Sequence, residues 1–339
     1  MGLFSTNEIT GIDVGAGGIK TVRIKPGKQP RLTAASIIEF PPETAGDSIA
    51  ANLRSLLSEK KINRKNVFTL MPGKELTIRS LSLPKMPLTE LREAVRWEAK
   101  RHISYALDAA FVEYVITGER REGVVDKYDI VMVAAEESKI KEHLLPFHET
   151  GLSVAVVDAK ALALRNTLFL RNGRTTVATL AVDIGAGNME INIFKEGILR
   201  FSRCLETGGN EITRLIADQL NISLHDAEIA KRNLKVVPAA QDKTVAVVAG
   251  RLDALLMEIR RSAEYYRTTS REKGVERAVL TGGAVLMKGL PEYFSTALGL
   301  PVELWNPFEA LAGGEALTHD LGPLAPRFSA AVGLALRNA

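Results

Sequence analysis

The same turn motif occurs twice in this chain, 170 residues apart. Asp-Val-Gly-Ala-Gly at residues 13–17 and Asp-Ile-Gly-Ala-Gly at residues 183–187 each follow an apolar segment and precede a second one. After the second turn, side chains alternate with a period of two, which is typical of a β-strand. Both motifs therefore predict strand–turn–strand hairpins. Because their spacing is about half of the 339 residues, we expect two similarly built halves. A chance recurrence of two tight hairpins is the alternative.

Length and composition restrict the class of protein. A chain of 339 residues predicts two domains or one large divided domain. Hydrophobic residues make up 46% and charged residues 25%, which excludes general disorder. The basic residues are scattered and the net charge is only +4, so nothing indicates a nucleic-acid partner. The single cysteine, Cys204, excludes an internal disulfide and favours a reducing, cytoplasmic compartment. No uninterrupted apolar run is long enough to predict a membrane span.

The segment between the two hairpins has a different character. Leu-Pro-Lys-Met-Pro at residues 83–87 predicts a rigid entry to a helix. One face of that helix is expected to carry Leu88, Leu91, Val95 and Ala99. Two strands at 111–117 and 128–134, joined by a charged loop at 119–127, are expected to follow. These elements predict a subdomain inserted into the first half.

Seven segments follow from this order of elements. We expect a first-lobe core (1–74), the inserted subdomain (75–150), a stretch with a linking helix (151–178), a second-lobe core (179–207), a helical subdomain (208–274), the remainder of the second-lobe core (275–325) and a C-terminal helix returning to the first lobe (326–339). Both tryptophans, Trp97 and Trp305, are expected in the core.

Glycine-rich hairpin turns point to phosphate binding. Consecutive backbone N–H groups at such a turn form a concave nest that favours phosphate oxygens. Gly15, Gly17 and Gly18 permit the necessary φ angles and leave no side chain between backbone and ligand. The alternative is a plain β-turn, in which Asp and Gly are also common. One hairpin alone favours that alternative, whereas two of matching composition favour nucleotide binding.

Two carboxylates and a lysine accompany these turns. Asp13 and Asp183 each stand at a strand end beside a turn, so we expect them to face each other across a cleft. They would hold Mg²⁺ there through water molecules, because this ion dehydrates reluctantly. Lys20 would add positive charge near the phosphates.

A third glycine turn, Thr-Gly-Gly-Ala at residues 281–284, lies between a predicted strand and a predicted helix. Its glycines would let a flat ring approach the backbone, and the helix N-terminus would favour an anionic group. Glu228 and Lys231 lie three residues apart on one helix face and would bracket a ribose or purine. The alternative for this pair is a solvated face on which Glu228 pairs with Arg232.

The order of these elements resembles the superfamily of actin, Hsp70 and sugar kinases. Within it the chain is similar to PilM-type type IV pilus assembly proteins, which are relatives of the cell-division protein FtsA. The carrying stretches are residues 11–20, 83–99, 182–186, 258–266, and 305–308 with 328–336. The stretch at 83–99 is the most specific, because phosphate hairpins occur throughout the superfamily.

The resemblance implies an α/β, actin-like (ribonuclease H-like) fold of two lobes that bind ATP with Mg²⁺ between them. It implies a cytosolic protein that docks the short cytoplasmic N-terminal segment of the inner-membrane protein PilN. Such proteins belong to the ring that couples the pilus motor ATPases to the pilus. The inserted subdomain would correspond to the 1C element of the family.

By matching position, the resemblance also assigns the nucleotide contacts. The first phosphate loop would comprise Asp13, Gly15, Ala16, Gly17, Gly18 and Lys20. The second would comprise Asp183, Gly185, Ala186, Gly187 and Asn188. The adenosine loop would comprise Gly282, Gly283 and Ala284, and the base and ribose side Gly208, Gly209, Glu228 and Lys231. Asp13 and Asp183 would be the metal-side residues.

Three departures from the family pattern weaken the expectation of hydrolysis. Residues 16–18 read Ala-Gly-Gly where relatives usually have serines, Asn188 replaces a Thr or Ser, and the third turn reads Gly-Gly-Ala-Val. In addition, Leu164, Arg165 and Asn166 stand where actin has a water-positioning glutamine, and no general base is evident. Backbone donors survive these changes, so we expect ATP binding with slow hydrolysis at most.

An enzyme of the same fold is the alternative function. The second loop, including Glu190, resembles that of an exopolyphosphatase, and a sugar kinase would share the architecture. Glu190 equally suits the polar face of a two-sided strand. A related secretion-system or division protein is a third alternative.

Overall fold

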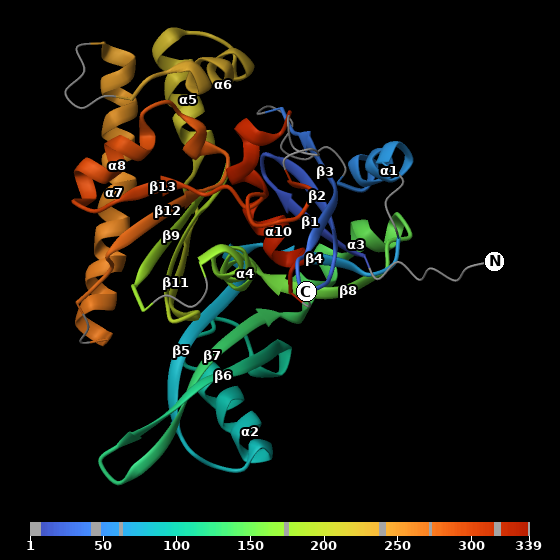
Figure 1. The fold of residues 1–339 in the computed structure, drawn as a ribbon, viewed down its shortest axis with the longest axis vertical. Helices are drawn as coiled ribbons and strands as arrows, with labels where there is room; N and C mark the ends of the chain where they lie inside the picture. Colours follow the sequence, from blue (N-terminus) through green and yellow to red (C-terminus); the bar gives the residue numbers. More distant parts are fainter. Residues whose placement is uncertain are drawn as a thin grey trace.

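Two five-stranded sheets with the same topology form the framework of the protein. The computed structural model describes residues 8–41, 49–60, 64–172, 176–236, 242–270, 273–314 and 320–337. The first sheet has the strand order β3-β2-β1-β4-β8 and the second the order β11-β10-β9-β12-β13 (Figure 1). We call the parts built around them lobe 1 and lobe 2.

Each sheet consists of an antiparallel meander followed by two parallel strands. The strands of lobe 1 are β1 (Ile9–Gly15), β2 (Gly18–Lys25), β3 (Arg31–Glu39), β4 (Val67–Met71) and β8 (Val154–Ala159). Those of lobe 2 are β9 (Thr179–Ile184), β10 (Met189–Lys195), β11 (Ile198–Leu205), β12 (Arg277–Thr281) and β13 (Val302–Leu304). β1 pairs antiparallel with β2 and parallel with β4, and β9 has the same relation to β10 and β12. This shared topology confirms the prediction of two similarly built halves.

A third, smaller sheet is inserted between β4 and β8. It has the order β5-β7-β6, with β5 (Leu76–Pro84), β6 (Ala110–Glu122) and β7 (Val125–Glu136), and it lies at the lower end of Figure 1. Helix α2 (Leu88–Ala99) covers one face of it with Leu91, Val95 and Ala99. Leu88, expected on the same helix face, is instead 60% exposed. We call this sheet with α2 the three-stranded unit.

The charged segment 119–127, expected to be a loop, forms the ends of β6 and β7 instead. Its charges pair across the two strands. Arg120 Nε lies 3.0 Å from Asp129 Oδ1, and Lys127 Nζ lies 2.7 Å from Glu122 Oε2. Opposite charges on paired strands stabilise a hairpin, so a charged composition is compatible with strand structure here. The expectation for Trp97 is also wrong, because it is 63% exposed, whereas Trp305 is buried.

Helices cover the main sheets. On lobe 1, α1 (Ile49–Lys60) and α3 (Glu137–Glu149) pack on one face, and α4 (Lys160–Asn172) and α10 (Ser329–Ala335) on the other. On lobe 2, the core includes α5 (Gly209–Leu220), α6 (Leu224–Asn233), α7 (Lys243–Ser270) and α8 (Leu290–Leu298). Short 3₁₀ segments are η1 (Gly73–Glu75), η2 (Leu107–Ala109), η3 (Ala284–Leu286) and η4 (Gly322–Phe328). Within the described ranges, no helix is both long and apolar enough to cross a membrane.

Helix α4 is shared by the two lobes. Leu164 packs in the core of lobe 1 together with α10, whereas Leu168 packs in a cluster that includes Trp305 of lobe 2. α10 crosses α4 at Gly333, where an added Cβ would overlap the carbonyl oxygen of Ala163. The missing side chain at this position therefore sets how closely the C-terminal helix approaches the helix between the lobes.

We expect Gly333→Ala to destabilise the protein by about 1–3 kcal/mol, because the added methyl group must push α10 away from α4. Urea unfolding followed by circular dichroism measures the difference. Gly250→Ala is the matched control, since Gly250 is exposed in α7 and an added Cβ there meets no atom within 4 Å. The control should stabilise the protein by about 0.5–1 kcal/mol, as alanine favours a helix over glycine. Equal effects of the two substitutions would contradict the close crossing.

Candidate functional site

The turns of the two β-hairpins meet between the lobes. A Cβ added at Gly17 would lie 3.0 Å from the Cβ of Ala186, and one added at Gly187 would lie 3.1 Å from the Cβ of Ala16. Gly18 has a φ of +136°, and a side chain there would also overlap the Ile38 carbonyl oxygen of β3. The first turn therefore requires glycine, and the two turns present small residues to each other.

The second turn is joined to the start of α5. Gly209 N–H donates to the Gly185 carbonyl oxygen at 2.8 Å, and Asn210 N–H donates to that of Ala186 at 2.8 Å. A Cβ added at Gly208 would lie 2.6 Å from the Gly185 oxygen. Carbonyl groups of the turn thus satisfy N–H groups at the helix start, which otherwise lack partners. Within the turn, Gly185 N–H donates to the Asn188 carbonyl oxygen at 2.9 Å.

Each predicted metal-side aspartate has a lysine partner. Asp13 Oδ2 lies 3.7 Å from Lys20 Nζ, and Asp183 Oδ1 lies 3.2 Å from Lys160 Nζ. Asp183 Oδ2 accepts a hydrogen bond from Thr281 Oγ1 at 2.7 Å. Both aspartates are buried. Burial lowers the pKa of Lys20, although the Asp13 carboxylate acts in the opposite direction.

Lys160 was not among the residues expected at the site. It is the first residue of α4, directly after β8. From this N-terminal end of the helix its ammonium reaches Asp183 of lobe 2. Leu164, Arg165 and Asn166, placed there by resemblance, lie elsewhere. Leu164 is buried in the core of lobe 1, Arg165 donates to the Gly197 carbonyl oxygen and Asn166 to that of Gly333. These three side chains therefore lie away from Asp183, whereas the first turn of the helix brings Lys160 to it.

Glu190 of β10 is buried against lobe 1. It is 3% exposed, and its Oε1 lies 3.8 Å from Lys160 Nζ. A Cβ added at Gly73 would overlap this oxygen. Burial raises the pKa of Glu190 to about 7, although the Lys160 ammonium opposes that shift. Burial would also lower the pKa of Lys160, but Asp183 and Glu190 outweigh it and raise that pKa. Glu190 shares its strand face with the polar Asn192, as that alternative expects, but the face is buried.

The predicted base and ribose residues come together at the start of α5. Lys231 Nζ lies 2.5 Å from Glu228 Oε2 and donates to the Gly209 carbonyl oxygen at 3.2 Å. A Cβ added at Gly209 would lie 3.1 Å from the Cβ of Ala284. Lys231 is 4% exposed, so it does not belong to a solvated face. The expected pairing of Glu228 with Arg232 is present as well, with Arg232 Nε 3.5 Å from Glu228 Oε1.

The third glycine turn packs against the end of β9, where Asp183 lies. Gly282 has a φ of +95°, and a Cβ there would overlap the carbonyl oxygen of Ile184, the residue that follows Asp183. This close approach explains why glycine follows Thr281, whose hydroxyl holds Asp183. A Cβ added at Gly283 would lie 3.7 Å from Arg327 Nε.

An ion-pair cluster that the sequence did not predict connects the lobes beside this site. Glu39, at the end of β3, pairs with Arg232 of α6 at 3.1 Å and with Arg327 of η4. Glu39 also lies opposite Gly18 in the β2–β3 register. The two arginines lower the pKa of the Glu39 carboxyl against the effect of its burial. Sequence separations of 193 and 288 residues leave no local pattern that would reveal these pairs.

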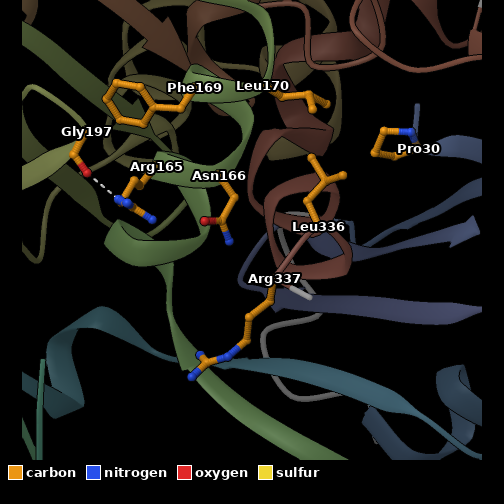
Figure 2. Close-up of a pocket in the computed structure, with 8 residues that line it drawn as sticks. All are labelled: Pro30, Arg165, Asn166, Phe169, Leu170, Gly197, Leu336 and Arg337. Atoms are coloured by element: carbon orange, nitrogen blue, oxygen red, sulfur yellow. Dashed lines mark hydrogen bonds between the residues drawn. The ribbon is translucent and has the colours of Figure 1, made fainter. Parts of the chain in front are cut away.

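A cavity of about 270 Å³ lies away from the hairpins, between α4 and the end of α10 (Figure 2). It is lined by Pro30, Arg165, Asn166, Phe169, Leu170, Gly197, Leu336 and Arg337. In Figure 2, the Arg165 side chain lies beside Gly197, to whose carbonyl oxygen it donates, and Arg337 extends from the end of α10. Arg337 also pairs with Asp158 of β8. None of the residues predicted for nucleotide contact lines this cavity, so it is separate from the candidate site.

The described acidic residues alone do not form a complete set of metal ligands. Among the residues that the structure describes, no group of three or more His, Cys, Asp or Glu side chains is arranged to hold an ion. Asp13 and Asp183 would therefore hold an ion together with water molecules and, when a phosphate compound is bound, its oxygens. Mg²⁺ is commonly held in this way, by one or two carboxylates together with substrate phosphates and water.

Comparison with known proteins places the chain in a family. The family model described as type IV pilus assembly protein PilM matches residues 11–339. This chain belongs to the PilM family. A solved PilM–PilN type IV pilus biogenesis complex contains a chain that is 28% identical, with a TM-score of 0.85 and coverage of 98% of both chains. MreB5 of Spiroplasma citri, solved bound to AMPPNP, is 13% identical with a TM-score of 0.50, over 94% of this chain and 95% of that one. The fold of this PilM-family protein is actin-like, as the resemblance implied.

Cell-division protein FtsA of Neisseria meningitidis serogroup B is a curated relative. It is 29% identical over 174 residues, which are 45% of this chain and 41% of that protein. FtsA of Rhizobium meliloti is 27% identical over 61% of this chain and 50% of that protein. The PilM-family chain thus matches only about half the length of these relatives or less, and the likeness supports the shared fold.

Proposed function

We propose that this PilM-family protein is a cytoplasmic, actin-like scaffold of type IV pilus assembly that binds ATP with Mg²⁺ between its lobes. The contact of the two glycine turns across the lobes carries this proposal. Buried lysines and aspartates stand directly beside that contact. The fold is shared with an MreB5 that was solved with the nucleotide AMPPNP, which supports a nucleotide ligand.

Different residues would contact the phosphates, the adenosine and the metal ion of the bound nucleotide. Backbone N–H groups of residues 15–18 and 185–188 would bind the phosphates, with Lys20 adding positive charge. Gly208, Gly209, Glu228, Lys231, Gly282, Gly283 and Ala284 would surround the adenosine. When bound, Mg²⁺ would neutralise phosphate charge, with Asp13 and Asp183 supplying its protein ligands. Ala16, Gly17 and Gly18 supply no hydroxyl group, so we expect turnover far below the value of about 10 s⁻¹ that is typical of enzymes.

The proposed partner is the cytoplasmic N-terminal segment of a PilN-like inner-membrane protein. A PilM–PilN complex among the similar structures supports this partner. We place the docking surface on the inserted subdomain, residues 75–150. Its strand β6 is at the edge of the sheet, and Phe111 and Val115 are exposed on the face that α2 does not cover. An exposed edge can accept an extended peptide as an additional strand. Association with the inner membrane would follow from this contact.

We expect isothermal titration calorimetry to detect ATP binding in Mg²⁺, and Asp13→Asn and Asp183→Asn each to weaken it by about fivefold. The loss should occur only with Mg²⁺ present, because these substitutions remove its protein ligands and not the phosphate donors. Asp218→Asn, at an exposed position of α5, is the matched control and should bind as the wild type. No binding by protein purified free of nucleotide would overturn the proposed cofactor. Unchanged binding by both variants would overturn the site.

We expect a peptide with the cytoplasmic N-terminal sequence of the PilN-like partner to bind, and Val115→Lys to weaken the binding by about tenfold or more. The lysine would place a charge on the proposed apolar face of β6. Val247→Lys is the matched control, since Val247 is also an exposed valine but lies in α7 of lobe 2. Fluorescence anisotropy of the labelled peptide measures both. Equal affinity of the two variants would refute the docking surface, and no binding by the wild type would refute the partner.

A further inference from the structure

The buried charged residues between the lobes outnumber those that the family resemblance assigns to the nucleotide site. Asp13, Asp183 and Glu190 supply three carboxylates, and Lys20 and Lys160 supply two ammonium groups. All five residues except Lys160 are 9% exposed or less, and the Lys160 side chain is 14% exposed. Buried ions need partners, because transfer from water is costly. The placement of Lys160 is what balances the lobe 2 carboxylates.

Lys160 reaches from one lobe to the other. It belongs to α4, next to β8 of lobe 1, whereas Asp183 and Glu190 lie on β9 and β10 of lobe 2. Its ammonium is 3.2 Å from Asp183 Oδ1 and 3.8 Å from Glu190 Oε1. Lys160 therefore occupies the side of Asp183 that a bound cation would need.

Glu190 offers the Lys160 ammonium an alternative partner. Asp183 Oδ2 is already held by the Thr281 hydroxyl at 2.7 Å. Glu190 Oε1 is buried and accepts no hydrogen bond. An ammonium displaced from Asp183 would therefore meet an unsatisfied acceptor within a short movement. Leaving such an acceptor unpaired is unfavourable in a buried site.

We propose that Lys160 is a built-in cation that competes with Mg²⁺ for Asp183 and supports nucleotide phosphates when the metal is absent. Without metal, its ammonium remains between Asp183 and the phosphates. With metal, Asp183 turns to the ion and the ammonium moves to Glu190. This inference rests on the proposed nucleotide site and predicts that ATP affinity depends only weakly on Mg²⁺.

Calorimetric titration of ATP in excess Mg²⁺ and in excess EDTA tests the proposal. The wild-type dissociation constants in the two conditions should differ by less than about tenfold. Lys160→Met should lose about tenfold or more affinity in EDTA and much less in Mg²⁺, and Lys160→Arg should restore binding in EDTA. Lys139→Met is the control, because Lys139 is an exposed lysine of α3 paired with Glu142. If Lys160→Met has the same ratio of affinities as the wild type, the proposal is wrong.

A second readout needs no nucleotide. Thermal unfolding with Mg²⁺ alone should show stabilisation of Lys160→Met and none of the wild type, because only the variant leaves Asp183 open to the ion. The double variant Lys160→Met/Glu190→Gln removes one charge of each sign and guards against misfolding of the single variant. Absence of any Mg²⁺ effect in both variants would overturn the competition. Wild-type protein that binds no ATP, together with variants that gain Mg²⁺ binding, would refute the proposed cofactor and leave the competition standing.

Discussion

The two lobes approach each other most closely at glycines, where a missing side chain lets groups of the opposite lobe come into contact. Gly17 lies against Ala186, Gly187 against Ala16, and Gly73 against the carboxylate of Glu190. Because the hairpin turns have no bulky side chains, their backbones come close enough for both to contact one ligand. The side chains that face the opposite lobe at the two turns, Ala16 and Ala186, are small, and larger apolar side chains of both lobes pack around α4.

Several ion pairs join the two lobes beside this seam. Lys160 on lobe 1 with Asp183 and Glu190 on lobe 2, and Glu39 on lobe 1 with Arg232 of α6, are ion pairs between the lobes. The buried pairs of Lys160 add little net stability compared with apolar packing, since desolvation offsets most of their attraction. The Glu39–Arg232 pair is partly exposed and is weakened by solvent. These pairs are nevertheless specific in geometry and sensitive to a new anion or cation.

Local patterns in the sequence account for the hairpins and the halves. The motifs at residues 13–17 and 183–187 predicted the turns, because strand alternation and turn glycines act over a few residues. The residues of the buried site are brought together by contacts between segments that are far apart in the sequence. Lys160 was missed because nothing near it indicates that the first turn of α4 reaches Asp183. The Glu39–Arg327 pair was missed because its members are 288 residues apart. The charged composition of residues 119–127 predicts a loop, because the ion pairs that stabilise the strand ends are visible only once the strand register is known.

Amide hydrogen exchange with and without ATP and Mg²⁺ tests most directly whether one ligand is bound by both lobes. Exchange at residues 15–18, 185–188 and 281–284 should slow together on addition of nucleotide, because backbone N–H groups of both hairpins would bind the phosphates and the third turn would lie against the adenosine. Exchange in the exposed part of α7 should remain unchanged. Protection confined to one lobe, or found around the cavity between α4 and α10 instead, would contradict a nucleotide site between the lobes.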